Sequence, residues 1–254
     1  MGVDIWTQCK GINFLTSYKG IAWRLIQAQD NISTRKLVDS LEEHRILEEL
    51  IDSTKPSNFD DSSNYHTLLS TPFRYPPLQY GSRFGKTTEH SLWYGSFNMY
   101  TAMAEKAFYQ FNFLRASEAE FGTVELSLTA FSAHVQSDRM IMLTDSPFSD
   151  YKEIISSPVS YETSQILGSA MRKNNIEVFA FHSARDPKHG VNMALFTPIP
   201  FIQKKPDSKS FQSWQCIATT DLIEFIRSSS DSFEAYSFPL NIFLVENSLP
   251  FPAN

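Results

Sequence analysis

The chain has 254 residues, a formal net charge of −6, 42% hydrophobic residues and only two cysteines. This composition excludes a disordered chain and a disulfide scaffold, and the acidic charge gives no general attraction to nucleic acid or to anionic lipid. No apolar run is long enough to cross a bilayer, and the sequence opens without a signal-peptide pattern. We therefore expect a cytoplasmic protein with neither a membrane nor a nucleic acid as its direct partner.

The N-terminal part contains one clear periodic segment. Leu and Ile recur at helical spacing after Ser33 and Thr34, which are candidate N-caps, and Pro56 ends the pattern. This spacing predicts an amphipathic helix over 33–52, whose charged face is either a solvated surface or a docking face for a partner protein. Residues 20–26 are apolar enough to be buried, but their pattern does not distinguish helix from strand.

The polar stretch 57–67 predicts a loop between two parts of the chain. We expect an N-terminal helical extension over 1–68 and a catalytic body over 69–254. Short apolar runs in the body are not regularly separated by helices, which predicts an α+β fold rather than a doubly wound parallel sheet. The expected strands are 73–75, 92–94, 124–129, 139–143, 176–181, 191–196, 214–219 and 238–245. The expected helices are 98–114 and 160–173.

Several well-known site motifs are missing from the sequence. It has no G-x-G-x-x-G, no P-loop, no G-x-S-x-G and no H-E-x-x-H. His182, Asp186 and His189 share a polar turn, but such a group is more often only a turn than a metal site. We therefore expect no metal and no Rossmann-type cofactor site.

Four side chains stand out from their local context, each with a plain structural alternative. Arg74, in FRYPP, and Arg83 are costly to bury unless they meet an anion such as a diphosphate, although an internal salt bridge or stacking on an aromatic ring would also serve. Tyr94 is either a core aromatic or a platform for a ligand ring. Glu105 lies among apolar residues of a predicted helix and needs a partner or a function.

Ser183 follows a predicted strand, in the turn HSARDPKHG. Turns after strands are common places for functional side chains, although a serine there is usually structural. Arg74, Arg83, Tyr94 and Glu105 fall on separate local elements, and we expect them to converge on one pocket for an anionic, aromatic, ribosyl ligand. NAD is the best candidate for that ligand.

The blocks TPFRYPPLQYGSRFG, LWYGS, TAMAEKAFY and FAFHSARDPKHGVNMALF, in this order, resemble the RES-domain proteins, the toxin half of the Xre–RES toxin–antitoxin pairs. The resemblance covers roughly residues 70–200. It places the arginine, glutamate and serine for which the family is named on Arg74, Glu105 and Ser183. Arg83 matches a second arginine, and Tyr94 matches the pocket tyrosine.

The resemblance implies a fold similar to ADP-ribosyltransferase toxins and consumption of NAD+ by hydrolysis or phosphorolysis, or ADP-ribosylation of a protein. It also implies neutralisation by an Xre-type antitoxin. The expected catalytic residues are Glu105, Arg74 and Tyr94, and the expected NAD+-binding residues are Arg74, Arg83, Tyr94 and Ser183. A non-enzymatic module that binds a partner through helix 33–52 remains an alternative.

Overall fold

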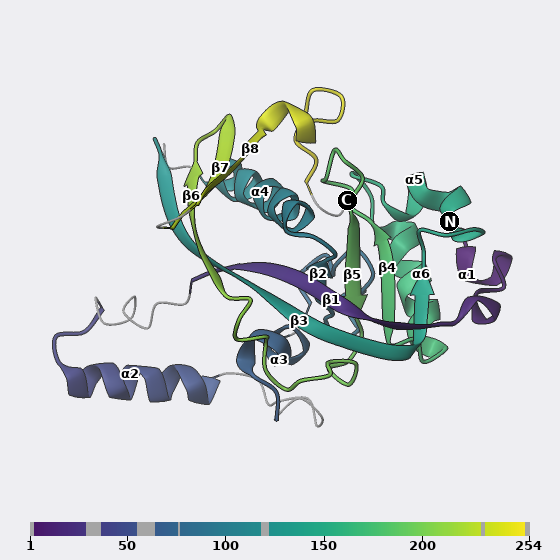
Figure 1. Ribbon diagram of the computed structural model, residues 1–254, viewed down its shortest axis with the longest axis horizontal. Coiled ribbons are helices and arrows are strands. Elements are labelled where there is room, and N and C mark those ends of the chain that lie inside the picture. The colour runs from purple at the N-terminus through teal and green to yellow at the C-terminus, as the bar shows by residue number, and fades with distance from the viewer. Residues whose placement is uncertain are drawn as a thin grey trace.

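The computed structural model describes residues 3–28, 37–54, 64–75, 77–117, 122–229 and 232–251. These form one eight-stranded sheet of order β1-β2-β5-β4-β3-β6-β7-β8, with helices packed against it (Figure 1). The predicted α+β class is confirmed. The strands are β1 (Thr16–Gln27), β2 (Trp93–Ser96), β3 (Val124–Met142), β4 (Val178–His182), β5 (Val191–Leu195), β6 (Gln212–Ala218), β7 (Leu222–Ser228) and β8 (Phe233–Pro239).

The long strand β3 organises the sheet. One edge of β3 pairs antiparallel with β1 from Leu128 to Met140. The other edge pairs antiparallel with β6 up to Ala130 and parallel with β4 from Met140 onward. Because β1 also pairs with β2, the strands β1, β2, β5, β4 and β3 close into a ring, and β6, β7 and β8 extend from the remaining half of β3.

The prediction of two strands at 124–129 and 139–143 was wrong, since the structure has one continuous strand. Residues 130–133 were missed because this part of β3 is covered on both faces. Phe131 and Ser132 point to opposite faces, yet both are buried, and the Ser132 N–H donates to Ser210 Oγ at 2.8 Å. Alternation of polar and apolar residues identifies only strands that have one solvent-exposed face.

The helices cover the sheet in two groups, with α4 against the β6–β8 half and α6 near α1 and β4 (Figure 1). The helices are α1 (Ile5–Gln8), α2 (Leu41–Thr54), α3 (Thr67–Arg74), α4 (Met99–Ala116), α5 (Lys152–Ile155) and α6 (Glu162–Lys173), with 3₁₀ turns η1 (Gly11–Phe14), η3 (Phe148–Tyr151) and η4 (Leu240–Phe243). Helices α4 and α6 confirm the predictions at 98–114 and 160–173. Asn98 caps α4, because its Oδ1 accepts from Thr101 N at 2.9 Å. None of the helices in the described part of the chain is long and apolar enough to span a membrane.

The predicted strand at 73–75 is instead the end of α3. The His66 side chain caps this helix by accepting from Leu68 N at 3.2 Å. Leu69 and Phe73, one helical turn apart, are both buried on the same side. This pairing, not the aromatic run around Arg74, determines the local structure.

The N-terminal part of the chain is not helical throughout. Residues 16–27 form β1, a member of the closed ring, so the apolar segment 20–26 is a strand. The predicted amphipathic helix is found as α2, where Ser40 and Glu43 cap each other's backbone N–H groups in a capping box. The candidate caps Ser33 and Thr34 lie outside the described residues, and the boundary at 68/69 stays a prediction.

The C-terminal strands also differ from expectation. The prediction of a strand at 238–245 was wrong for most of its length. The strand β8 lies earlier and ends at Pro239, and the turn η4 follows it. Proline has no N–H to donate to a ladder, which suits the end of a strand. Strand β7 was not predicted. The remaining strands β2, β4, β5 and β6 confirm the predicted ones to within a few residues.

Candidate functional site

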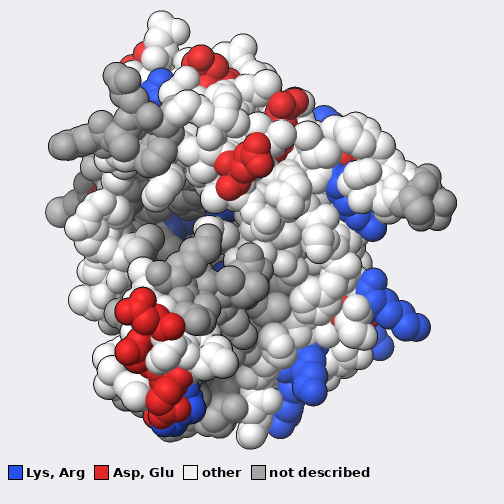
Figure 2. Space-filling model, turned by 90° about the vertical axis from the view of Figure 1, so that its left-hand side faces the viewer, with Lys and Arg blue, Asp and Glu red and all other residues white. Residues whose placement is uncertain are grey.

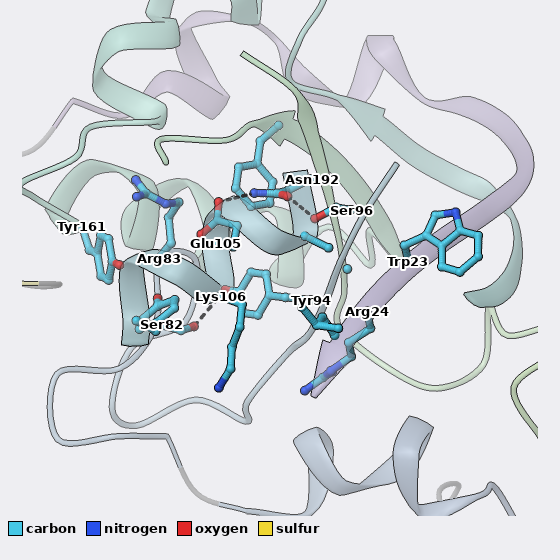
Figure 3. Close-up of a pocket in the computed structure, with 15 residues that line it drawn as sticks. Trp23, Arg24, Ser82, Arg83, Tyr94, Ser96, Glu105, Lys106, Tyr161 and Asn192 are labelled. Atoms are coloured by element: carbon cyan, nitrogen blue, oxygen red, sulfur yellow. Dashed lines mark hydrogen bonds between the residues drawn. The ribbon is translucent and has the colours of Figure 1, made fainter. Parts of the chain in front are cut away.

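A cavity of about 250 Å³ lies where the closed ring of strands meets α4 (Figure 3). Strands β1, β2, β4 and β5, the loop before β2 and the segment before α6 all contribute to its wall. The lining residues are Trp23, Arg24, Leu25, Ser82, Arg83, Tyr94, Gly95, Ser96, Ala102, Glu105, Lys106, Tyr109, Tyr161, Phe181 and Asn192.

Glu105 is held in one orientation by two donors. Its Oε1 accepts from Ser183 Oγ at 2.7 Å and from Asn192 Nδ2 at 2.6 Å. Asn192 is itself fixed by Ser96 Oγ, which donates to Asn192 Oδ1 at 2.6 Å, because β2 and β5 place Ser96 and Asn192 opposite each other. Both hydrogen bonds fall on Oε1, and within the described structure Oε2 accepts none, so Oε2 is the oxygen available to a ligand.

Ser183 joins the turn after β4 to the carboxylate. Besides donating to Glu105, its Oγ accepts from Arg185 N at 3.1 Å and from Asp186 N at 3.0 Å. The Asp186 carboxylate in turn accepts from Thr101 Oγ1 on α4 at 2.7 Å. These contacts bind the turn to α4 at Thr101 and at Glu105, which explains how a serine far along the chain reaches the carboxylate.

Arg83 is a fixed cation on the cavity wall. It is only 9% exposed, and its Nη1 donates to Ser157 O at 2.7 Å. Its guanidinium lies over the Tyr161 ring, 4.7 Å from the centroid. Such stacking fixes the plane of the guanidinium and leaves other N–H groups for an anion.

Tyr94 is a half-buried wall residue whose hydroxyl organises the neighbouring loop. Its OH lies 2.9 Å from Ser82 Oγ and accepts from Phe84 N at 3.3 Å. Burial raises the pKa of Tyr94 to about 12, despite the opposing effect of these hydrogen bonds. The phenol is therefore neutral at physiological pH, and it holds the Ser82–Phe84 loop that carries Arg83.

Arg74 is the last residue of α3 and is not among the residues that line the cavity. Arg24 of β1, which the sequence analysis did not single out, is a lining cation. Within the described structure, Arg24 Nη1 is buried without a hydrogen-bond partner. Its guanidinium lies 5.3 Å from the centre of the Trp93 ring. Burial lowers the pKa of Arg24 to about 10, so the group is still charged at neutral pH.

The structure thus brings together four of the five predicted side chains. Arg83, Tyr94 and Glu105 line the cavity, and Ser183 contacts Glu105 from outside it. Sequence reasoning missed Arg24, although an arginine within the apolar run 20–26 gives the same signal that drew attention to Arg74. It also missed Asn192, for which the sequence offers no signal.

The charge of the lining favours an anionic ligand. Arg24, Arg83 and Lys106 face the cavity with Glu105 as the only carboxylate among its lining residues. Burial lowers the pKa of Lys106, because a charged amine is poorly solvated there. Figure 2 shows basic side chains recessed in a hollow near the middle of one face, with acidic ones on the surface around it. In the described ranges, no group of three or more His, Cys, Asp or Glu residues could hold a metal ion.

Comparison with known families identifies the class of protein. The family model of the RES domain matches residues 60–215, so the chain belongs to the RES-domain family. This family is associated with toxin–antitoxin systems and with toxins that act on NAD. A search of curated proteins finds no match for the chain.

Proposed function

We propose that this protein consumes NAD+ by breaking the bond between nicotinamide and ribose. The observation that carries the proposal is the Glu105 carboxylate, held by Ser183 and Asn192 at the edge of a cavity whose other charged lining groups are cationic. A single fixed carboxylate among cations suits a ligand with a diphosphate at one end and a developing positive charge at the other.

The chemistry needs little beyond positioning and electrostatics. Cleavage passes through a state in which the ribose carries positive charge, as in glycoside hydrolysis. The bond electrons go to the nicotinamide nitrogen, which leaves as a neutral ring, so no general acid is required. The free oxygen of Glu105 stabilises the ribosyl cation or bonds a ribose hydroxyl.

The cations have a separate role in this proposal. Arg24 and Arg83 bind diphosphate oxygens, and Arg24 takes the place that the sequence assigned to Arg74. Tyr94 acts as a neutral wall for the nicotinamide ring and as support for the loop of Arg83. Ser183 keeps Glu105 in place from outside the cavity lining, and this support role replaces the nucleotide contact expected from the sequence.

The partner is also part of the proposal. The family's association with toxin–antitoxin systems supports a cognate Xre-type antitoxin that inhibits the toxin by covering the cavity. Hydrolysis, phosphorolysis and transfer to a protein share the same first bond cleavage, and they differ only in the group that attacks the ribose.

Product analysis tests the proposal. Purified protein is incubated with NAD+ in buffer with and without inorganic phosphate, and the products are separated by chromatography and weighed by mass spectrometry. We expect free nicotinamide in an amount equal to the NAD+ lost. ADP-ribose, its phosphate ester or a protein adduct would identify the acceptor. NAD+ that stays intact through long incubation at high enzyme concentration would reject the proposal.

A further inference from the structure

A second cavity lies on the far side of the Ser183–Glu105 contact. Its volume is about 280 Å³, and it shares no lining residue with the first cavity. The turn after β4 forms one wall, the region of α5 a second, and η4 with the residues after it a third. The lining residues are Lys152, Glu153, Ser156, Pro158, Ser183, Ala184, Arg185, Asp186, Pro187, His189, Ile242, Phe243, Leu244 and Val245.

Arg185 is the unusual member of this lining. It is only 4% exposed, and its Nη2 is buried without a hydrogen-bond partner in the described structure. One face of its guanidinium lies against the Phe108 ring, 3.5 Å from the centroid. A buried guanidinium with an unmet donor is costly in the empty protein, and an anion that accepts from it would remove the cost.

Glu105, which lines the first cavity, attracts the charge of Arg185, but Arg185 Nη2 still has no hydrogen-bond acceptor in the described structure. The two acidic residues that line the second cavity do not supply one. The Asp186 carboxylate accepts from Thr101 Oγ1, from Lys188 N at 2.8 Å and from Gly190 N at 3.2 Å, so its oxygens serve its own turn and α4. Glu153 is exposed at the rim. Lys152 also lines the cavity, half-buried, and adds a second positive charge beside Arg185.

The rest of the wall is apolar. Phe243 and Val245 come from the segment that follows β8, and Pro158 and Pro187 come from two other segments. The cations on one side can bind a phosphate group, either free or as part of a larger molecule. The apolar side chains on the other side can contact the organic part of such a molecule.

We propose that this second cavity is a phosphate-binding site, centred on Arg185 with Lys152 at its rim. The phosphate group is either inorganic phosphate or the phosphate of a nucleotide such as AMP. The site shares no lining residue with the proposed NAD+ cleavage site. Two interactions link the sites: the Ser183 hydroxyl bonds Glu105, and Arg185 and Glu105 attract each other electrostatically.

The test measures binding of two probes without NAD+. Inorganic phosphate and AMP are titrated into the full chain by calorimetry at constant ionic strength, with chloride as the competing salt. Arg185→Gln is expected to weaken both probes at least tenfold, and Lys152→Gln about threefold. Lys19→Gln, an exposed lysine of β1, is the matched control and is expected to bind both probes as the parent chain does.

The two sources are told apart by the relative affinities. Equal affinity for both probes identifies the free phosphate group as the ligand, and tenfold tighter AMP identifies a nucleotide. If Arg185→Gln impairs folding, the binding affinity of Lys152→Gln for the two probes tests the proposal in its place. No binding of either probe, or binding that neither substitution weakens, overturns the proposal.

Glu105→Gln separates this site from the cleavage site. We expect that variant to lose NAD+ consumption and to keep phosphate binding. Should the parent chain fail to consume NAD+ while Arg185 still governs phosphate binding, the cleavage proposal fails and the second site stands. Loss of phosphate binding in Glu105→Gln would assign the phosphate to the first cavity instead.

Discussion

Replacement of Arg24 by methionine is expected to stabilise the protein while removing its activity. Arg24 is half-buried, its Nη1 atom is buried without a hydrogen-bond partner in the described structure, and its pKa of about 10 keeps the guanidinium charged. An unmet buried donor costs ~1–3 kcal/mol, and loss of the contact with Trp93 subtracts ~0.5–1 kcal/mol from the gain. Methionine is a flexible side chain that can fill the space left by the arginine stem.

The net expectation for Arg24→Met is a gain of about 1–2 kcal/mol in the free energy of unfolding. For a chain of this size the gain corresponds to a rise of about 2–8 °C in Tm. NAD+ turnover should fall about a hundredfold, because a diphosphate contact is lost. Thermal unfolding followed by circular dichroism gives the first quantity, and nicotinamide release gives the second.

Arg227→Met is the matched control. Arg227 Nη1 lies 2.8 Å from Glu234 Oε1 on the partly exposed β7–β8 surface, far from the cavity lining. Its loss should lower stability by no more than about 1 kcal/mol and leave turnover unchanged. An Arg24→Met protein that is less stable than the parent yet equally active would show that Arg24 is a structural cation, and the reasoning would be refuted.

Three further substitutions test other contacts. Asn192→Ala removes a donor to Glu105 and should lower kcat about tenfold with little change in KM, as measured by steady-state nicotinamide release; a change in KM alone would contradict the role. Tyr94→Phe keeps the ring but loses the contact with Ser82, so urea unfolding should show a loss of about 1 kcal/mol; unchanged stability would mean that the contact is unimportant. Burial raises the pKa of Cys216 to about 11 from 9.0, so its contribution to stability is complete below pH 9 and declines as pH rises toward 11. Cys216→Ala should therefore lose less stability than the parent between pH 9 and pH 10, by at most about 1.4 kcal/mol, and equal losses in urea titrations would contradict this.

The parts of the fold that the sequence predicted are those with a simple period. Helix α6 buries one stripe, helix α4 is rich in strong helix formers, and strands β4 and β5 are compact apolar runs. Residues 130–133 of β3 were missed because burial on both faces removes the alternation on which the prediction rests. The sequence did not decide between helix and strand for residues 20–26 of β1, because a short apolar run has no distinctive period.

The residues of the candidate site were likewise predictable only where they carried a local signal in the sequence. Glu105 was predictable because a carboxylate among apolar residues of a helix is locally anomalous. Arg24 and Arg74 carried the same local signal, an arginine in an apolar setting, and only the pairing of β1 with β2 and β3 shows that Arg24 is the one in the cavity. Asn192 matters only through its register opposite Ser96, which no local pattern reveals.

The most direct test of the account is NAD+ turnover by Glu105→Gln. Glutamine keeps an oxygen that can accept from Ser183 and Asn192, so the variant should fold with a Tm close to that of the parent. Glu125→Gln, on the exposed side of β3, is the control for loss of a negative charge. We expect at least a hundredfold fall in nicotinamide release for Glu105→Gln and none for Glu125→Gln. Turnover by Glu105→Gln at the parent's rate would contradict the central claim that this carboxylate stabilises the ribosyl cation formed as nicotinamide leaves.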